Sequence, residues 1–332
     1  MIQILMAVYN NQPYLQEQLD SILSQEGPEF SLFIRDDYST DGSLELLKEY
    51  QKKYPEKIRL FLSIKNEGVK KNFSSLVQLA NADYLMFSDG DDVWLPEKVK
   101  KTFEEMQHLE NTYGKHLPLL IHTDLKVVDS SLNPKSDSFW YYSCLNPTHG
   151  NFLNRLLVSN VVTGCTLMIN RRLLEKAKPF PQEMIMHDWW LGLVATTFGR
   201  IGYLSDATIL YRQHGKNVLG AESLRSYRVI IKKCFFILTN NGLREICKKI
   251  WKIQLQGLVF YQRYCAEMGG RKARMTWDFV EMFYVGGLLG TRLFFENKFY
   301  KNTKLKNFLF FILIMTQSFF LKNIYNYGRF KK

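Results

Sequence analysis

The first hundred residues alternate short apolar runs with amphipathic stretches, and this alternation limits the fold more than any other feature. Apolar runs rich in β-branched and aromatic residues are typical of buried strands, and apolar residues three and four apart are typical of helices. The strands predicted here are 2–8, 30–36, 58–62 and 84–88, and the helices are 13–25, 43–54, 72–82 and one from 96. This rhythm predicts an α/β fold with a mostly parallel sheet, helices on both faces and ligands at the carboxyl ends of the strands.

The rest of the chain divides into two parts of different character. Further strands are expected at 117–124, 164–170, 200–204 and 207–214, with a helix beginning at 187. Beyond about residue 220 we expect long helices at 225–238, 243–268 and 272–300, followed by the apolar run 307–321. We therefore predict an α/β domain over 1–217, with halves 1–100 and 118–217, and an all-helical extension over 218–332.

The extension carries the positive charge of the chain. Residues 215–332 hold 22 Lys and Arg against 6 Asp and Glu, whereas residues 1–214 hold 22 against 26. A basic surface of this kind suits nucleic acid, an anionic membrane or solvent alone. Because no helix-turn-helix, zinc-finger or RNP-like pattern accompanies the charge, we expect no nucleic-acid partner.

The apolar run 307–321 is too short to be a clear membrane span. Its 15 residues include Asn, Thr, Gln and Ser, and a spanning helix needs about 20 apolar residues. An interfacial helix at a membrane surface, a buried helix and a homodimer contact all remain open.

The cysteines and the N-terminus indicate a reducing compartment. Five cysteines are widely spaced, without a C-x-x-C pair or metal-finger spacing, so we expect reduced thiols. The first residues lack a basic leader and a cleavage site. We therefore expect a cytoplasmic protein.

Three carboxylates follow the apolar run 84–88, namely Asp89, Asp91 and Asp92. In an extended segment alternate side chains share a face, so Asp89 and Asp91 are expected to converge while Asp92 points away. Converging carboxylates repel unless a cation or hydrogen-bond donors meet them, and Mg²⁺ or Mn²⁺ prefers such oxygen ligands. A solvated acidic turn is the alternative interpretation.

Three more side chains stand at element ends. Asp37 follows the strand 30–36, where a carboxylate can accept from the imide N–H of a pyrimidine. Asp188 begins the helix at 187, and either a general base or an ordinary helix N-cap would use a carboxylate there. His214 ends the last strand, as a metal contact or as an ordinary surface or core residue.

Together these segments resemble the inverting nucleotide-sugar glycosyltransferases of glycosyltransferase family 2, which have the GT-A fold. The resemblance covers roughly residues 1–217 and rests on ILMAVYNNQPYLQEQLDSILSQ (4–25), IRDDYSTDGS (34–43) and SDGDDVWLP (88–96). Within the family, residues 122–129, 161–174 and 186–215 look most like bacterial rhamnosyltransferases of cell-wall and O-antigen synthesis. The resemblance makes 1–100 the nucleotide-binding half and 118–217 the acceptor and catalytic half.

The resemblance also implies a role for each matching residue. Ala7 and Tyr9 would line the nucleotide pocket, Asp37 would contact the pyrimidine, Asp89 would lie near ribose and metal, Asp91 would be the principal metal ligand, Asp188 the catalytic base and His214 a further metal or diphosphate contact. Many family members carry proline at the position of Ala7. The glycine between the acids leaves the choice between Asp91 and Asp92 open, and the alternation of side chains favours Asp91.

The implied reaction is a metal-dependent, inverting transfer with Mg²⁺ or Mn²⁺ as cofactor. The donor would be dTDP-β-L-rhamnose, and the acceptor a hydroxyl of a glycan carried on a polyprenyl lipid at the inner face of the cell membrane. The basic helices would then contact the membrane surface, form a homodimer, or both. A UDP-hexose donor and a catalytically inactive glycan-binding module are the alternatives, and intact Asp91 and Asp188 favour an enzyme.

Overall fold

The computed structural model describes residues 1–215 and 240–325, apart from the side chains of 240, 241, 243 and 316–325. The chain forms two compact units. The first unit comprises Met1–Asn151, Val162–Phe180 and the described residues from Met186 to 215, and the second comprises Phe152–Val161, Pro181–Ile185 and the described residues from 240 onward. The predicted domain boundary after 217 and the predicted helix 225–238 lie outside the described residues.

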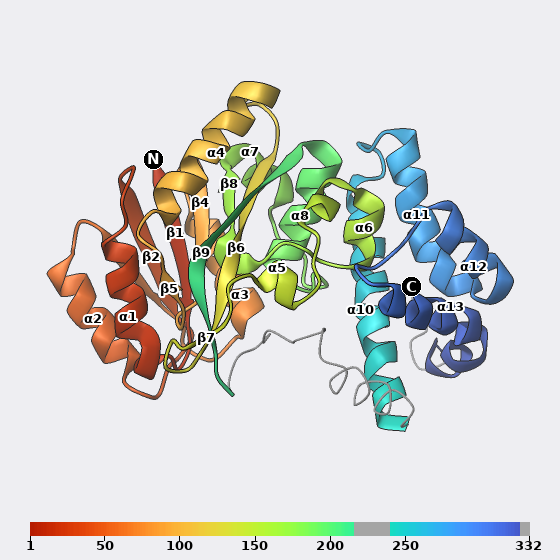
Figure 1. Ribbon diagram of the computed structural model, residues 1–332, viewed down its shortest axis with the longest axis horizontal. Helices are drawn as coiled ribbons and strands as arrows, with labels where there is room; N and C mark the ends of the chain where they lie inside the picture. Colours follow the sequence, from red (N-terminus) through yellow and green to blue (C-terminus); the bar gives the residue numbers. More distant parts are fainter. Residues whose placement is uncertain (216–239, 326–332) are drawn as a thin grey trace. The chain divides into compact units, whose positions relative to one another are not determined.

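A single mixed sheet organises the first unit (Figure 1). Its strands are β1 (Ile2–Val8), β2 (Phe30–Asp36), β3 (Ile58–Leu62), β4 (Tyr84–Ser88), β5 (Val93–Trp94), β6 (Leu119–Asp129), β7 (Pro134–Ser136), β8 (Met168–Asn170) and β9 (Arg200–Gln213). The spatial order is β3-β2-β1-β4-β8-β6-β9-β5, with β7 beside β6. Strands β3, β2, β1 and β4 are parallel to one another, as are β6 and β9, while β8 runs antiparallel to its neighbours β4 and β6.

Helices cover both faces of this sheet. They are α1 (Gln12–Leu23), α2 (Ser43–Lys53), α3 (Val69–Leu79), α4 (Lys98–Tyr113), α5 (Phe139–Tyr142), α7 (Arg171–Ala177) and α8 (His187–Phe198), with 3₁₀ turns η1 (Pro147–Asn151) and η2 (Gly164–Thr166). Figure 1 shows α1 and α2 on one side of β1 and β2 and α3 on the other. The predicted α/β class and the helices on both faces are confirmed.

Burial explains why the strands and helices of the first unit could be predicted from the sequence pattern. All seven residues of β1 are buried, because a parallel strand between two helical layers exposes neither face. Leu15, Leu19 and Ile22 on α1 join the apolar cluster on one face of the sheet. On the other face Phe73 of α3 meets Phe87 of β4, with ring centroids 5.8 Å apart.

Three predicted elements differ from the structure. The predicted strand 164–170 begins as the turn η2, and only Met168–Asn170 is extended. The predicted strands 200–204 and 207–214 form one strand, β9, which has register shifts against β6. The predicted helix 272–300 is two helices, because Gly286 and Gly287 both have φ of 52°, a conformation that glycine adopts readily and that ends a helix.

The second unit is all helical. It contains α6 (Leu153–Val158), α10 (Asn240–Tyr264), α11 (Gly270–Val285), α12 (Gly287–Glu296) and α13 (Lys304–Tyr325). Its core is aromatic: Phe279 packs on Phe299 at 5.4 Å, and Phe283 on Phe310 at 5.9 Å. Among the described residues, no helix has the length and apolar character needed to cross a membrane.

The short helix α6 joins this unit although it precedes β8 in the chain. Asn154 Nδ2 donates to the carbonyl of Asn297 at 3.0 Å, and Arg155 Nη1 donates to the carbonyl of Tyr300 at 3.1 Å. These bonds connect segments more than 140 residues apart, so local sequence patterns carry no signal for them.

Candidate active site

The carboxyl ends of β1, β2 and β4 meet at one edge of the sheet. The register pairs Val8 with Asp36 and Met6 with Ser88, so the residues that follow these strands lie at the same level. Ala7 is buried in β1, and Tyr9 is 46% exposed just beyond it. The structure therefore places the candidate nucleotide residues at the edge predicted from the strand–helix rhythm.

Asp37 is 1% exposed and holds the loop that precedes α3. Its carboxylate accepts from the backbone N–H of Glu67 at 3.1 Å and of Gly68 at 2.7 Å. Arg35 Nη1 lies 3.4 Å from the same carboxylate, and Arg35 Nη2 also pairs with Glu67 at 2.7 Å. Asp37 thus fixes a second loop at the candidate nucleotide edge, a role that the sequence did not reveal.

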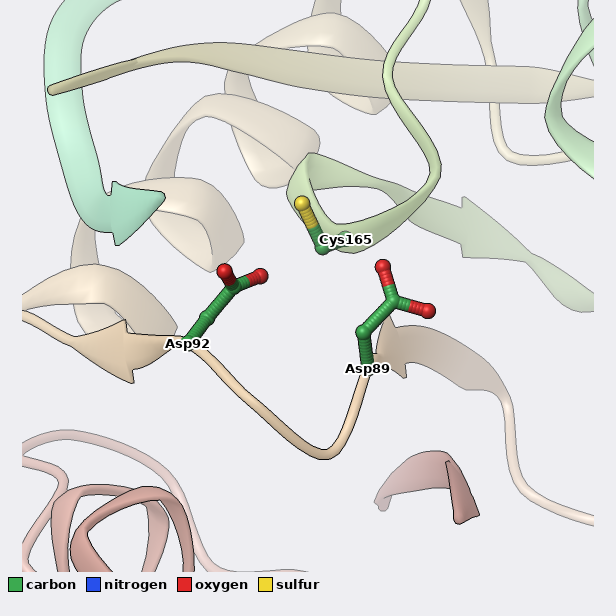
Figure 2. Close-up of side chains that lie close together, drawn as sticks. All are labelled: Asp89, Asp92 and Cys165. Carbon is green, nitrogen blue, oxygen red and sulfur yellow. The ribbon is translucent and has the colours of Figure 1, made fainter. Parts of the chain in front are cut away.

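The acidic loop, residues 89–92, bends instead of continuing β4. Figure 2 shows the carboxylates of Asp89 and Asp92 directed to the same side, next to the thiol of Cys165. One potential ligand atom from each of these three residues lies within 4.8 Å of the others. The expectation that Asp92 points away from Asp89 was therefore wrong, because strict alternation of side chains requires an extended strand and this segment turns.

Asp91 is directed to the end of β9. Its Oδ2 lies 2.8 Å from Nε2 of His214, 123 residues along the chain. Asp92 is also tied to β9, because its Oδ1 accepts from the backbone N–H of Arg212 at 3.1 Å. The structure thus brings together Asp91 and His214, the two residues predicted to contact a metal.

Gly90 leaves room for a neighbouring side chain within this loop. A Cβ atom at this position would lie 2.6 Å from Oδ1 of Asn11. Asn11 Oδ1 in turn accepts from the backbone N–H of Tyr9 at 2.9 Å. A glycine between the acids therefore lets the acidic loop approach the segment that follows β1.

Asp188 lies in the first turn of α8. The helix begins at His187 and its N-cap is Met186, so the alternative that Asp188 is the N-cap was wrong. Asp188 is 7% exposed, and its Oδ1 accepts from the backbone N–H of Trp189 at 2.6 Å. His187 beside it is buried between Phe73 and Phe87, at 4.1 and 5.0 Å between ring centroids, which anchors the start of the helix.

The electrostatics join these acids into one group. Burial, followed by the charges of Asp91 and Asp188, raises the pKa of Asp89 to about 7. Burial and the charges of Asp91 and Asp89 raise the pKa of Asp92 well above its ordinary value. Clustered carboxylates that are costly to ionise without a counter-charge suit a divalent cation.

A lysine missed by the sequence reasoning lies beneath this group. Lys98 at the start of α4 is fully buried, and its Nζ lies 4.7 Å from the centre of the Trp94 ring. Burial lowers its pKa to about 8, against the raising effect of Cys165 and Asp92. The available sequence signal was the position of Lys98, which stands at the helical spacing of core residues. A lysine in such a position indicates a charged neighbour, since lysine is rarely fully buried without one.

The chain matches the family model for glycosyl transferase family 2 over residues 3–176. It is 31% identical over 256 residues to the dTDP-rhamnosyl transferase RfbG of Shigella flexneri, covering 73% of this chain and 82% of that protein. It is 25% identical over 309 residues to an uncharacterised glycosyltransferase of Nostoc, covering 87% and 88%.

Solved structures share the fold at low sequence identity. TarS of S. aureus in complex with UDP gives a TM-score of 0.51 at 16% identity, over 99% of this chain and 93% of that one. The mannosyltransferase PcManGT of Pyrobaculum calidifontis, in complex with GDP-Man and Mn²⁺, gives 0.50 at 15%, over 98% and 88%. Matched by the family model over more than half of its length, this chain belongs to glycosyl transferase family 2 and is a glycosyltransferase with the GT-A fold.

Proposed function

We propose that this enzyme transfers L-rhamnose from dTDP-β-L-rhamnose to a hydroxyl of a glycan acceptor, in a metal-dependent reaction that inverts the anomeric centre. The observation that carries the reaction class is the convergence of Asp89, Asp91, Asp188 and His214 at the carboxyl edge of the sheet. The choice of rhamnose is supported by the 31% identity to the dTDP-rhamnosyl transferase of Shigella flexneri.

The donor nucleotide would lie over the ends of β1 and β2. Ala7 and Tyr9 would line the pocket for the base, and Asp37 would contact the pyrimidine ring. The Asp37 carboxylate accepts from two backbone N–H groups and so holds residues 67–68 in place. It would contact the pyrimidine from this fixed position. Asp89, on the adjacent strand end, would lie near the ribose.

Asp91 and His214 would hold Mg²⁺ or Mn²⁺, with Asp89 beside them. One carboxylate oxygen and one imidazole nitrogen 2.8 Å apart form a donor set that suits either ion. When bound, the ion would stabilise the negative charge of the departing diphosphate. His214 Nε2 and Asp91 Oδ2 also contact each other directly, at 2.8 Å.

Asp188 would take the proton from the acceptor hydroxyl as that oxygen attacks the anomeric carbon. Two observations support this role: the carboxylate is largely buried, and it is close enough to Asp89 for their charges to interact. It lies in the first turn of α8, at the positive end of the helix dipole, and a carboxylate can take a proton as a general base. A single displacement of this kind leaves an α-L-rhamnoside.

A donor panel tests the proposal. The protein is incubated with Mn²⁺ or Mg²⁺ and dTDP-β-L-rhamnose, UDP-glucose or UDP-galactose, and nucleotide release is measured with and without EDTA. Release from dTDP-rhamnose that EDTA abolishes is expected. Release from a UDP-sugar alone would replace the donor by a UDP-hexose, and binding of glycans without any release would favour an inactive glycan-binding module.

We also propose that the helical unit brings the enzyme to a polyprenyl-linked acceptor at the cytoplasmic face of the membrane. Leu288 and Leu289, at the start of α12, are 80% and 64% exposed. Apolar side chains and basic residues together favour anionic bilayers. Co-sedimentation with anionic but not neutral vesicles is expected, and a concentration-dependent dimer without vesicle binding would assign this surface to self-association.

A further inference from the structure

We propose that Arg212 and Tyr14 are positioning residues that fix Asp91 and His214 in place before the cation binds. This inference rests on the metal site proposed above. It concerns two residues that contact neither the cation nor the donor in that proposal. Both belong to the first unit, Tyr14 on α1 and Arg212 near the end of β9.

Arg212 is 2% exposed and joins three separate segments. Its Nε donates to the backbone carbonyl of Asp91 at 2.9 Å, and its Nη1 donates to the carbonyl of Ser130 at 2.7 Å. Its Nη2 forms an ion pair with Glu17 of α1, which compensates the buried positive charge. The side chain therefore holds the acidic loop against both α1 and the turn after β6.

The backbone of Arg212 adds a second link to the same loop. Its N–H donates to Oδ1 of Asp92 at 3.1 Å. One residue thus fixes two consecutive members of the acidic loop, one through its side chain and one through its main chain. These two bonds restrain both the position of the loop and its rotation.

Tyr14 connects the guanidinium to the imidazole of His214. The guanidinium carbon of Arg212 lies 4.7 Å from the centre of the Tyr14 ring. The ring of His214 stacks on Tyr14 with centroids 4.8 Å apart and planes 18° apart. Since His214 also contacts Asp91 Oδ2 at 2.8 Å, the contacts close into a ring that runs Asp91, Arg212, Tyr14, His214 and back to Asp91.

This closed set of contacts has a physical consequence for cation binding. Ligands that are already held at fixed positions lose little further freedom when the ion arrives, so residues behind the ligands alter metal affinity about 10- to 100-fold. Arginine suits the position because its planar fork reaches three acceptors while its face packs on a ring. Lysine offers one point charge and cannot reproduce that arrangement.

The test uses four variants and Mn²⁺ as the probe. Binding of Mn²⁺ in the presence of dTDP is followed by the loss of the free-ion EPR signal, and thermal unfolding is recorded for each protein. Arg212→Lys removes the planar guanidinium and Tyr14→Leu removes the aromatic ring, whereas Tyr14→Phe keeps the aromatic ring. Arg171→Lys is the matched control, because Arg171 makes a comparable bond, to the carbonyl of Ala80 at 3.1 Å, away from the acidic loop.

We expect Arg212→Lys and Tyr14→Leu to weaken Mn²⁺ binding about 10- to 100-fold. Tyr14→Phe and Arg171→Lys should bind as the wild type does. Turnover of the two weakened variants should recover when Mn²⁺ is raised to saturation, because the reacting groups are intact. A purely structural role would lower turnover without this recovery.

Two results would overturn the inference. Wild-type Mn²⁺ affinity in folded Arg212→Lys and Tyr14→Leu would remove the positioning role and leave the proposed function standing. Absence of Mn²⁺ binding by the wild-type protein with dTDP would remove the metal site itself, and the positioning role with it. If Arg212→Lys fails to fold, the comparison of Tyr14→Leu with Tyr14→Phe decides.

Discussion

The acidic edge of the α/β unit is the end of the sheet around the acidic loop 89–92, Lys98 and Asp188. This edge and the core of the helical unit accommodate buried groups in opposite ways. At the acidic edge, Asp92 and Lys98 are fully buried, and Asp92 Oδ2 and Lys98 Nζ have no hydrogen-bond partner among the described residues. In the helical unit, Phe279, Phe283 and Phe310 fill the interior with edge-to-face contacts.

This contrast fits the proposal that the acidic edge serves the reaction and the aromatic core serves stability. Buried charges without full compensation cost stability and are kept where they perform chemistry. Aromatic packing gains stability without supplying reactive groups. Substitution of a reacting carboxylate at the acidic edge should therefore lower turnover and spare the fold, whereas substitutions in the helical core should lower the free energy of unfolding.

The largest effect is expected for Asp188→Asn. Removing a general base lowers turnover about 10²- to 10⁴-fold, while the amide keeps the size of the side chain. The initial rate of nucleotide release with acceptor present measures this loss, and the thermal midpoint should stay near that of the wild type. Rates within a factor of about three of the wild type would exclude Asp188 as the base.

The next effect is expected for Phe279→Ala in the helical core. Phe279 is fully buried and contacts Phe283 at 5.2 Å and Phe299 at 5.4 Å between centroids. Truncation of a buried Phe to Ala lowers the free energy of unfolding by about 3–5 kcal/mol, measurable by urea unfolding. Exposed Trp277→Ala is the control, and equal losses for both would contradict the assignment of the core.

A smaller effect concerns pH and separates the acidic edge from other buried groups. Because the pKa of Asp89 is raised to about 7, the folded protein without a cation keeps a proton between about pH 4 and 7 that the unfolded chain has released. This contribution lowers the free energy of unfolding as the pH rises through that window. A divalent cation requires the ionised carboxylate, so Mn²⁺ should raise the thermal midpoint more at pH 7.5 than at pH 5.

Buried histidines produce the opposite slope. Burial lowers the pKa of His122 and of His187 to about 3. The contribution of these two histidines to the free energy of unfolding is therefore complete above about pH 6.5 and is lost as the pH falls toward 3. The histidine contribution cancels when the thermal midpoints with and without Mn²⁺ are compared at one pH. If Mn²⁺ raised the thermal midpoint equally at pH 5 and at pH 7.5, that result would contradict the raised pKa of Asp89.

Much of the candidate site could be predicted because parallel strands end at one edge. The residues after β1, β2 and β4 had to lie near one another once the strands were recognised, which located Tyr9, Asp37 and Asp89. What could not be predicted was the direction of each side chain beyond a strand end. Asp92 converges with Asp89 because residues 89–92 bend, and a bend has no fixed periodicity.

The sequence by itself determined the strand–helix alternation, the acids at the strand ends and the basic character of the late helices, because these follow from local periodicity and composition. Only the tertiary structure decided that Arg212 and Tyr14 link Asp91 to His214, that Cys165 lies beside Asp89 and Asp92, and that α6 belongs to the helical unit. The physical reason is chain separation. Contacts between residues far apart in sequence depend on how whole elements pack, and no local pattern encodes that packing.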